Sequence, residues 1–336
     1  MKTEILRAGS RGERRVAVAQ AVKLLRAGEI VALPTETVYG LAADALNIEA
    51  VVKIFAAKER PRFDPLIVHI PDRNWFQRVA VIPEDAREIV GALAKEFWPG
   101  PLTFVLPRHE IVPDVVTAGL ATVATRVSAH ELWSEIIREF GGPLAAPSAN
   151  RFGHISPTMA EHVRDELDGL IPLIVDGGAT AHGLESTIIA VRNRRIEILR
   201  RGPVTEEQLR FFGEIAPSPV PLSIEAPGQM RSHYAPSTPL LVIEDGSAFI
   251  PPAGKRCGLL AWNPDVEPAR FAEVRILSAK QDLTEAATNL FRFLRELDEA
   301  TLDLLVAEAV PERSLGAAIM DRLRRAAARD HSVRAF

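Results

Sequence analysis

Three basic side chains close together give the first indication of chemistry in this sequence. Lys58, Arg60 and Arg62 follow the stretch 50–57, in which apolar residues recur at helical spacing. The dipole of a helix favours positive side chains at its C-terminus, and the same side chains can hold an anion. The sequence therefore predicts either a charge-stabilised helix end or a site for an anionic group such as a phosphate.

Two further polar residues end apolar stretches that are typical of buried strands. Arg126 lies in TVATRV, and His69 closes LIVH. A buried guanidinium needs a partner, and a carboxylate fits its fork of N–H groups best. Either an acidic residue of the chain or a carboxylate of a substrate could be that partner. A single histidine at a strand end is more often structural than catalytic, so His69 alone indicates no activity.

Short polar side chains and another arginine stand at other predicted strand ends. Ser148 and Asn150 follow the buried stretch in LAAPSAN, and Ser156 could cap a helix. Ser186 follows the glycine-rich turn DGGATAHG, and Arg200 ends the last strand of this part. Each signal is weak when taken alone. Polar residues at the strand ends of one sheet are, however, typical of the ligand sites of open α/β folds.

The elements that must position these residues alternate between helix and strand and then become mainly strand. Closely spaced strands at the end of this part predict a mixed sheet, not a purely parallel one. We expect helices at 14–27, 83–97, 132–140, 159–167 and after 203, and strands at 29–33, 102–106, 122–127, 143–146, 171–175, 187–191 and 196–199.

A proline-rich segment separates this part from the rest of the chain. Prolines between 216 and 239 are too dense for a helix or a central strand, which predicts a semi-extended strap. From 240 onward, apolar strands alternate with amphipathic helices, a pattern typical of a doubly wound parallel sheet. Its first strand is followed by no Gly-x-Gly-x-x-Gly motif, which disfavours a dinucleotide site. We expect domains at 1–215 and 239–336, joined by the strap 216–238.

Composition limits the classes of function. The chain has 336 residues, a net charge of −4 and one cysteine, which argues against a nucleic-acid coat protein and against an internal disulfide. Neither a Gly-x4-Gly-Lys-Ser/Thr loop nor a His-Glu-x-x-His or Gly-x-Ser-x-Gly motif occurs. The charged N-terminus is unlike a secretory signal, and no run is long enough to span a membrane. We therefore expect a cytoplasmic protein.

Seven motifs in a fixed order identify a family resemblance. They are PTETVYGL, KERP, PLIVH, PSAN with a downstream SPT, GLEST, LRRGPV and HYAP. This set resembles the long, two-domain form of the threonylcarbamoyl-AMP synthases, and the resemblance covers the whole chain. It implies an α/β fold with a YrdC-like N-terminal domain, which is a twisted mixed sheet with flanking helices. A smaller C-terminal domain with a doubly wound, Rossmann-like parallel sheet would follow.

The resemblance also implies a reaction and its residues. L-threonine, bicarbonate and ATP would give threonylcarbamoyl-AMP and pyrophosphate, with Mg²⁺ held mainly by ATP. The product would serve a separate transferase system that forms N6-threonylcarbamoyladenosine at position 37 of tRNAs reading ANN codons. The implied threonine site is Thr37, His69, Arg126, Ala146 and Ser186. The implied ATP site is Lys58, Arg60, Asp64, Thr122, Ser148, Asn150, Ser156, Arg200 and Tyr234, of which Lys58, Arg60, Ser148 and Asn150 would be catalytic.

The sequence departs from the family pattern at two positions. Asp64 stands in RPRFDPL where many relatives carry asparagine, which would add a negative charge beside the phosphates or favour a metal ion. Ser128 stands where proline is frequent, which we expect to alter only local rigidity. The HYAP segment of the strap would act as a lid that excludes water from the reaction.

Two other functions compete with this interpretation. A concave basic face of the same fold could bind double-stranded RNA or tRNA without catalysis, although the acidic net charge counts against it. The same domain could instead activate another carbamoyl group, as in hydrogenase maturation, but the acylphosphatase and zinc-finger segments expected for that role do not occur.

Overall fold

The computed structural model describes residues 2–216, 224–230 and 233–328. The chain forms two compact units. The first contains the described residues of Met1–Phe152, Pro157–Ala181 and Glu185–Gln229, and the second those of Gly153–Ser156, His182–Leu184 and Met230–Phe336. Two short segments of the N-terminal half therefore belong to the second unit.

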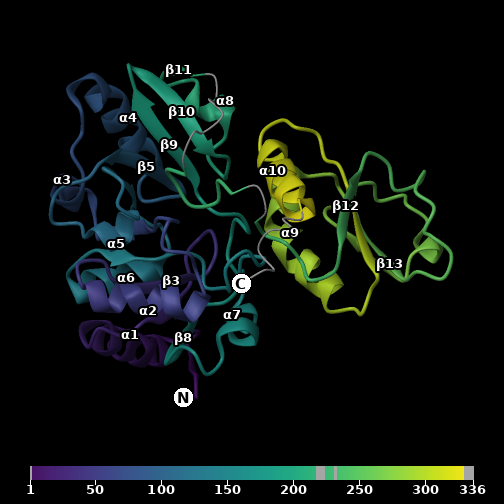
Figure 1. The fold of residues 1–336 in the computed structure, drawn as a ribbon, viewed down its shortest axis with the longest axis horizontal. Helices are drawn as coiled ribbons and strands as arrows, with labels where there is room; N and C mark the ends of the chain where they lie inside the picture. Colours follow the sequence, from purple (N-terminus) through teal and green to yellow (C-terminus); the bar gives the residue numbers. More distant parts are fainter. Residues whose placement is uncertain (1, 217–223, 231–232, 329–336) are drawn as a thin grey trace. The chain divides into compact units, whose positions relative to one another are not determined.

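A mixed sheet of eleven strands forms the centre of the first unit, as the sequence predicts (Figure 1). The strand order is β1-β8-β2-β3-β7-β4-β6-β5-β9-β10-β11, and both parallel and antiparallel neighbours occur. The strands are β1 (Glu4–Arg7), β2 (Val31–Leu33), β3 (Gly40–Asp44), β4 (Ile67–His69), β5 (Leu102–Pro107), β6 (Thr122–Arg126), β7 (Leu144–Ala145), β8 (Leu173–Asp176), β9 (Thr187–Arg192), β10 (Arg195–Arg200) and β11 (Glu214–Ile215).

The helices of this unit begin and end where caps and periodicity place them. Ser10 caps the first helix by accepting from the amide of Glu13, whose side chain accepts from the amide of Ser10, so the helix begins at Arg11 and not at Arg14 as expected. The helices are α1 (Arg11–Arg26), α2 (Ile48–Lys58), α3 (Phe76–Val79), α4 (Arg87–Phe97), α5 (Asp114–Thr117), α6 (Glu131–Phe140), α7 (Ala160–Leu167) and α8 (Glu206–Leu209), with 3-10 turns at Arg73–Trp75 and Glu84–Ala86.

Alternation along the central strands buries both faces of the sheet. In β2, Val31 and Leu33 join the core that contains residues of α1 and α6, whereas Ala32 joins the core that contains residues of α2, α4 and α7. Because successive side chains of a strand point to opposite faces, one strand supplies both cores. Fully buried strands of this kind hold their ends at fixed positions, which is what a site built at strand ends requires.

The register of three neighbouring strands determines which predicted residues meet. β4 is parallel to β6, with His69 opposite Arg126. β7 is antiparallel to β4, with Leu144 opposite His69. The chain after β7 therefore runs back toward the amino end of β4. This direction carries the PSAN segment away from His69 and toward the residues that precede β4.

The second unit contains a four-stranded parallel sheet in the order β12-β15-β13-β14. Figure 1 shows α9 and α10 beside β12 and β13. The elements are β12 (Leu240–Ile243), β13 (Cys257–Ala261), β14 (Glu273–Ile276), β15 (Leu304–Glu308), α9 (Leu283–Asp298) and α10 (Gly316–Ala327), with a 3-10 turn at Pro268–Arg270. The predicted mixed sheet and separate parallel sheet are both confirmed.

A buried carboxylate closes the carboxyl end of this parallel sheet. Glu308, the last residue of β15, is 1% exposed. One of its oxygens accepts from the amide of Gly246 at 2.5 Å, and the other accepts from the amides of Trp262 and Asn263 at 2.6 and 2.7 Å. The strand ends of the second unit are thus joined to one another by a side chain of the chain itself.

Three strands of the first sheet, β1, β3 and the two-residue β11, are not predicted from the sequence. β1 is short and mostly exposed, so it lacks an apolar signal, although it pairs with β8 over four residues. β3 follows the turn of PTETVYGL and contains mainly small residues, GLAAD. Its antiparallel pairing with β2 makes this turn the end of a hairpin. The polar residues of the motif therefore project from the end of two central strands.

Candidate functional site

Arg126 is the centre of a buried polar cluster at the carboxyl end of β6. Its side chain is 3% exposed. Nε donates to the carbonyl of Gly100 at 3.1 Å, and Nη1 donates to Oγ1 of Thr37 at 3.0 Å. Nη2 lies 2.7 Å from a carboxylate oxygen of Glu36. The sequence left two partners open for this arginine, and the structure supplies the internal one.

Glu36 is a member of this cluster that the sequence analysis overlooked. Its carboxylate accepts from the hydroxyl of Ser128 at 2.5 Å and from the amide of Ala129 at 3.0 Å. Burial alone would raise the pKa of Glu36, but the charge of Arg126 and these two hydrogen bonds lower it to about 2. An acidic residue between two threonines in a motif flanked by apolar residues was the available signal. The role of Ser128, the second departure from the family pattern, is to hold this carboxylate.

His69 lies next to Arg126 across the parallel pair β4 and β6. Its ring is 4.5 Å from the ring of Trp133, between centroids, and its side chain is buried. Burial, and then the charge of Arg126, lower the pKa of His69 to about 3, so the imidazole is neutral at neutral pH. Within the described part of the chain, Nδ1 of His69 makes no hydrogen bond. Because the ring is neutral and Nδ1 makes no hydrogen bond within the described residues, this nitrogen can form one with a ligand.

A second cluster lies where α2 ends. Nζ of Lys58 donates to the carbonyl of Ser148 at 2.6 Å and to the carbonyl of Asn150. Burial of its side chain, and then the charge of Arg60, lower the pKa of Lys58 to about 7. The return of the chain after β7 therefore brings the PSAN segment to the predicted basic group. A lysine held between two carbonyls near its pKa can gain a full charge when an anion arrives.

Arg60 and Asp64 form a buried ion pair in the same cluster. Nη2 of Arg60 lies 2.9 Å from the carboxylate of Asp64 and 2.8 Å from the carbonyl of Pro65. Burial raises the pKa of Asp64, while the charges of Arg60, Lys58 and Arg200 oppose that rise. Asp64 thus balances three cations. This pairing with Arg60 is a role that we do not expect from the sequence, from which we expect either added negative charge beside the phosphates or a preference for a metal ion.

Arg200 joins the turn that carries Ser186 to the charges of the Lys58 cluster. Its Nε and Nη2 donate to the carbonyl and to Oγ of Ser186, both at 3.0 Å, and its charge also acts on Asp64. Oγ of Ser186 lies 2.8 Å from Oγ1 of Thr103. Antiparallel pairing of β9 and β10 causes this meeting, because it brings the end of β10 to the start of β9.

A close approach of two turns stabilises this connection. Gly202 packs so tightly that a Cβ atom there would lie 2.5 Å from the carbonyl of Glu185 and 2.5 Å from the amide of Thr187. Real Cβ atoms do not come so close to backbone atoms, so the position requires glycine. The glycine of the LRRGPV motif therefore holds this turn against the GLEST turn that carries Ser186.

The remaining predicted residues occupy different places along the strands. The amide of Ala146 donates to the carbonyl of Ile67 at 2.9 Å, at the amino end of β4. Thr122 is half-buried at the opposite end of β6 from Arg126. Thr37, His69 and Arg126 therefore lie toward the carboxyl ends of β4 and β6, whereas Asp64, Ala146 and Thr122 lie toward their amino ends. The candidate site follows the length of these strands and is not confined to one edge.

Two predicted residues belong to the second unit. Ser156 is fully buried there. The ring of Tyr234 lies 5.4 Å from that of Phe291 on α9, and the guanidinium of Arg322 on α10 lies 5.0 Å from the centroid of the Tyr234 ring. The strap tyrosine is therefore packed into the C-terminal unit, and Arg231, which the sequence also placed in the strap, lies outside the described residues.

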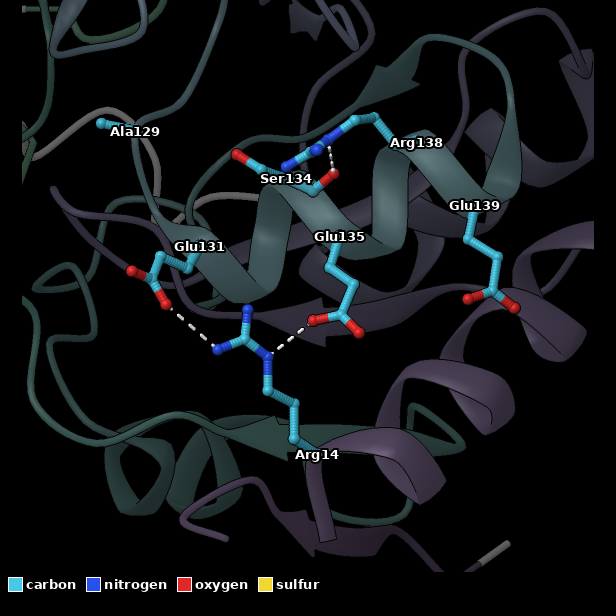
Figure 2. Close-up of a pocket in the computed structure, with 7 residues that line it drawn as sticks. All are labelled: Arg14, Ala129, Glu131, Ser134, Glu135, Arg138 and Glu139. Carbon is cyan, nitrogen blue, oxygen red and sulfur yellow. Dashed lines mark hydrogen bonds and ion pairs between the residues drawn. The ribbon is translucent and has the colours of Figure 1, made fainter. Parts of the chain in front are cut away.

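A separate hollow on the first unit contains none of the predicted residues. Figure 2 shows Glu131, Glu135 and Glu139 on α6, with Arg14 of α1 between the first two carboxylates. Arg14 donates to Glu131 at 3.1 Å and to Glu135 at 2.6 Å. These ion pairs are partly exposed to water and join α1 to α6. We interpret them as a contact between two helices on the outer face.

The mixed sheet and the two buried polar clusters define an α/β protein with a candidate site for a polar, charged ligand. Two family models match the chain. The family described as "Telomere recombination" (Sua5_yciO_yrdC) matches residues 23–202, and the family described as "Threonylcarbamoyl-AMP synthase, C-terminal domain" matches residues 204–328. The chain belongs to the Sua5/YciO/YrdC family, so the resemblance seen in the motifs is confirmed.

Similar proteins extend over nearly the whole chain. The threonylcarbamoyl-AMP synthase of Pyrococcus abyssi is 40% identical over 323 residues, which cover 91% of this chain and 92% of that protein. The enzyme of the same name from Bacillus subtilis is 41% identical over 326 residues, covering 92% of each. A crystal structure of P. abyssi Sua5 complexed with L-threonine matches with a TM-score of 0.85 and 39% identity, covering 97% of this chain and 98% of that one.

Among the described residues, no helix combines the length and the apolar character needed to cross a membrane.

Proposed function

We propose that this chain is a threonylcarbamoyl-AMP synthase, a nucleotidyltransferase that converts L-threonine, bicarbonate and ATP into threonylcarbamoyl-AMP and pyrophosphate. The observation that carries the proposal is a series of contacts that leads from Arg126 toward the Lys58 cluster. The carbonyls of the adjacent residues Gly100 and Pro101 accept from Arg126 and from the amide of Thr187. Arg200 then joins the neighbouring Ser186 to the charges around Asp64. A reaction that joins an amino acid to a nucleotide needs two such subsites in contact. The relatives that bear this name match both units of the chain.

The Arg126 cluster suits an amino acid with a hydroxyl side chain. The guanidinium would bind the threonine carboxylate, since Nη2 makes no aligned hydrogen bond within the described residues. Thr37, Ser186 and His69 would supply small polar partners for the amine and the hydroxyl, and the backbone at Ala146 would complete the subsite. P. abyssi Sua5, at 39% identity, has been crystallised with L-threonine.

The Lys58 cluster suits a triphosphate. Lys58, Arg60 and Arg200 would neutralise phosphate oxygens, while Ser148 and Asn150 would hold the nucleotide at the same turn. Thr122 would extend the ATP site toward the amino ends of the strands. The proposed ATP site also includes Ser156 and Tyr234.

The chemistry needs no covalent nucleophile from the protein. The threonine amine and bicarbonate would form a carbamate with loss of water, and a carbamate oxygen would then attack the α-phosphorus of ATP and displace pyrophosphate. The protein's contribution would be to position three reactants and exclude water, and positioning alone can supply roughly 7–11 kcal/mol of the barrier.

Mg²⁺ would enter as part of the MgATP substrate. Within the described residues, no group of three or more His, Cys, Asp or Glu side chains is arranged to hold a metal ion. The one acidic side chain predicted for the ATP site, Asp64, is paired with Arg60. The phosphates themselves are therefore the proposed ligands of Mg²⁺. Lys58, Arg60 and Arg200 would neutralise the negative charge of the phosphates that the ion leaves uncompensated.

The product would pass to a separate transferase system that modifies adenosine 37 of tRNAs reading ANN codons. Both the carbamate and the mixed anhydride are lost to water, so we propose that the HYAP segment acts as a lid. Packing of Tyr234 against Phe291 and Arg322 would anchor that lid in the C-terminal unit. The domain division of 1–215, 216–238 and 239–336 is part of this proposal.

The described part of the strap refines the test of the lid. Ala226 packs into a core of the first unit, and the carbonyl of Pro227 accepts from Nη1 of Arg200. Cutting the chain after Gly213 would therefore remove contacts of the first unit as well as the lid. Tyr234→Ala in the full chain is the cleaner variant, and we expect it to lower product yield more than ATP affinity. Equal yield would contradict the lid.

The activity is tested by pyrophosphate release with threonine and bicarbonate each omitted in turn, with the nucleotide product identified by mass. Release that requires both substrates and yields threonylcarbamoyl-AMP is the expected result. ATP cleavage independent of threonine, or none, would contradict the synthase. The alternative of a double-stranded RNA or tRNA-binding module would then be tested by a salt-dependent gel shift.

A further inference from the structure

The carboxylate of Glu36 has no role in the function proposed above, although it lies within the threonine subsite. It is the partner of Arg126, with 2.7 Å between the nearest atoms. Ser128 and Ala129 each donate a hydrogen bond to it. The ion pair and the two hydrogen bonds favour the ionised form of this buried carboxylate.

The guanidinium of Arg126 does not depend on Glu36 for its orientation. Nε is held by the carbonyl of Gly100 and Nη1 by Thr37, so two contacts already fix its plane. Nη2 is close to Glu36 but makes no aligned hydrogen bond in the described part of the chain. What Glu36 adds to this arrangement is therefore mainly negative charge.

The charges of Arg126 and Glu36 cancel one another within their ion pair. Arg126 contributes one positive charge and Glu36 one negative charge, and the lowered pKa values of Glu36 and His69 keep the carboxylate ionised and the imidazole neutral at neutral pH. His130, the other titratable group beside Glu36, has its pKa lowered by burial. A neutral ion pair is electrically matched to a zwitterion and not to a simple anion.

We propose that Glu36 is a specificity-determining residue that makes the Arg126 subsite select a zwitterionic amino acid and reject a carboxylate that lacks an ammonium group. The inference rests on the proposed function, because it assumes that Arg126 binds the substrate carboxylate. It adds the reason why a hydroxy acid of the same shape does not occupy the subsite.

The selection has a consequence within the reaction. Carbamoylation converts the threonine nitrogen into a neutral amide, so the threonyl part of the product keeps its carboxylate but has lost the ammonium charge. Beside Glu36 the substrate is therefore held more tightly than the threonyl part of the product. The same carboxylate that selects the substrate favours release of the product.

Equilibrium binding to the full chain without ATP tests the proposal. The probes are L-threonine and (R)-3-hydroxybutyrate, which keeps the carboxylate and the hydroxyl and lacks the ammonium. The variants are Glu36→Gln, which removes the charge at nearly constant shape, and Glu36→Asp, which retains the charge. Glu135→Gln is the matched control, because Glu135 is also ion-paired with an arginine, Arg14, which is not one of the predicted site residues.

Opposite changes for the two probes are expected. In Glu36→Gln the dissociation constant for threonine should rise by about tenfold or more, while that for (R)-3-hydroxybutyrate should fall by a similar factor, as for a charge removed within a few ångströms of the ligand. Glu36→Asp should keep the preference of the wild type for threonine, and Glu135→Gln should leave both constants unchanged.

Equal weakening of both probes in Glu36→Gln would overturn the proposal, because a merely structural defect acts on both in the same direction. The wild type provides a test that does not depend on a folded variant. If it binds (R)-3-hydroxybutyrate as tightly as threonine, selection by charge is wrong. A wild type that binds neither probe would overturn the proposed function as well, so the two failures can be told apart.

Discussion

The two sheets of this protein treat the charged groups at their strand ends in opposite ways. In the first unit, Nη2 of Arg126 at the end of β6 lies 2.7 Å from the carboxylate of Glu36, without an aligned hydrogen bond among the described residues. In the second unit, Glu308 at the end of β15 accepts hydrogen bonds from three backbone amides in the loops that follow β12 and β13. Both folds offer the strand ends at which α/β proteins bind ligands.

The difference shows that a strand end becomes a site only where its polar groups are not already satisfied within the chain. The amides around Glu308 would suit a phosphate, as in nucleotide-binding folds, but a carboxylate fills their position. In the first unit, Lys58 lies between carbonyl oxygens and its pKa is lowered to about 7. Its amine can therefore take up a proton when an anionic ligand binds. Four substitutions or conditions test this contrast.

Arg126→Ala should have the largest effect, because it removes the guanidinium on which the proposed threonine subsite depends. Glu36 would remain as a buried, unpaired carboxylate, and unfolding free energy should fall by about 3–5 kcal/mol. Adenylate formation, measured by mass, should drop at least about a hundredfold, as for loss of a positioning contact to substrate. Arg126→Lys keeps the charge and should recover stability more than activity. A normal rate in Arg126→Ala would remove this residue from the site.

Glu308→Gln opens the closed edge of the second unit. A glutamine amide would turn N–H groups toward one of the backbone donors, so we expect a loss of about 1–3 kcal/mol in the stability of this unit. Faster hydrogen exchange at the amides of Gly246, Trp262 and Asn263 would locate the loss. Adenylate formation should change by less than about twofold at a site whose chemistry lies elsewhere. Unchanged exchange would show that the carboxylate does not close this edge.

The charge of Lys58 gives the first unit a pH dependence. Its pKa of about 7 in the free protein lies below the usual value for lysine, and bound phosphates favour the protonated form. Binding of ATP above pH 7 should therefore take up a proton, and affinity should fall by up to about tenfold per pH unit as the pH rises. Calorimetry in buffers of different ionisation enthalpy measures this uptake. Lys58→Met should abolish it, and uptake that persists would assign the proton to another group.

The smallest effect should follow Glu135→Gln, which breaks one ion pair of the surface hollow. Arg14 retains Glu131 as a partner, and pairs exposed to water contribute only about 0.2–1 kcal/mol. Urea unfolding should show a change within that range, which falls further in high salt. A loss comparable to that of Arg126→Ala would mean that burial does not decide which ion pairs matter in this protein.

Much of the fold could be predicted because it is written in local patterns. Most predicted strands and helices occur within a few residues of their expected bounds, including β9, β10, α9 and α10. The exceptions include β1, which is too exposed to show an apolar signal, and β3, which is made largely of small residues. The short elements α3, α5 and β11 were not predicted either. Strand order and register could not be predicted, since they depend on contacts between distant segments.

The candidate site was predictable as a set of residues but not as a set of contacts. The sequence motifs predicted Arg126 and Arg200 as site residues. Only the register of β4, β6, β9 and β10 shows which groups these arginines contact. Glu36 was not predicted because the sequence does not distinguish a buried carboxylate in a turn from one that is exposed to solvent. Roles that depend on a bound ligand remain proposals for every residue of the site.

The glycine at position 202 has a consequence for how this sequence can vary. A side chain there would push the turn after β10 away from the turn that carries Ser186. Arg200 would then lose its two contacts of 3.0 Å to Ser186, although every functional side chain would still be present. The spacing between the two proposed subsites therefore depends on the absence of a side chain at position 202. A homologue with a bulkier residue at this position would have a site of a different length.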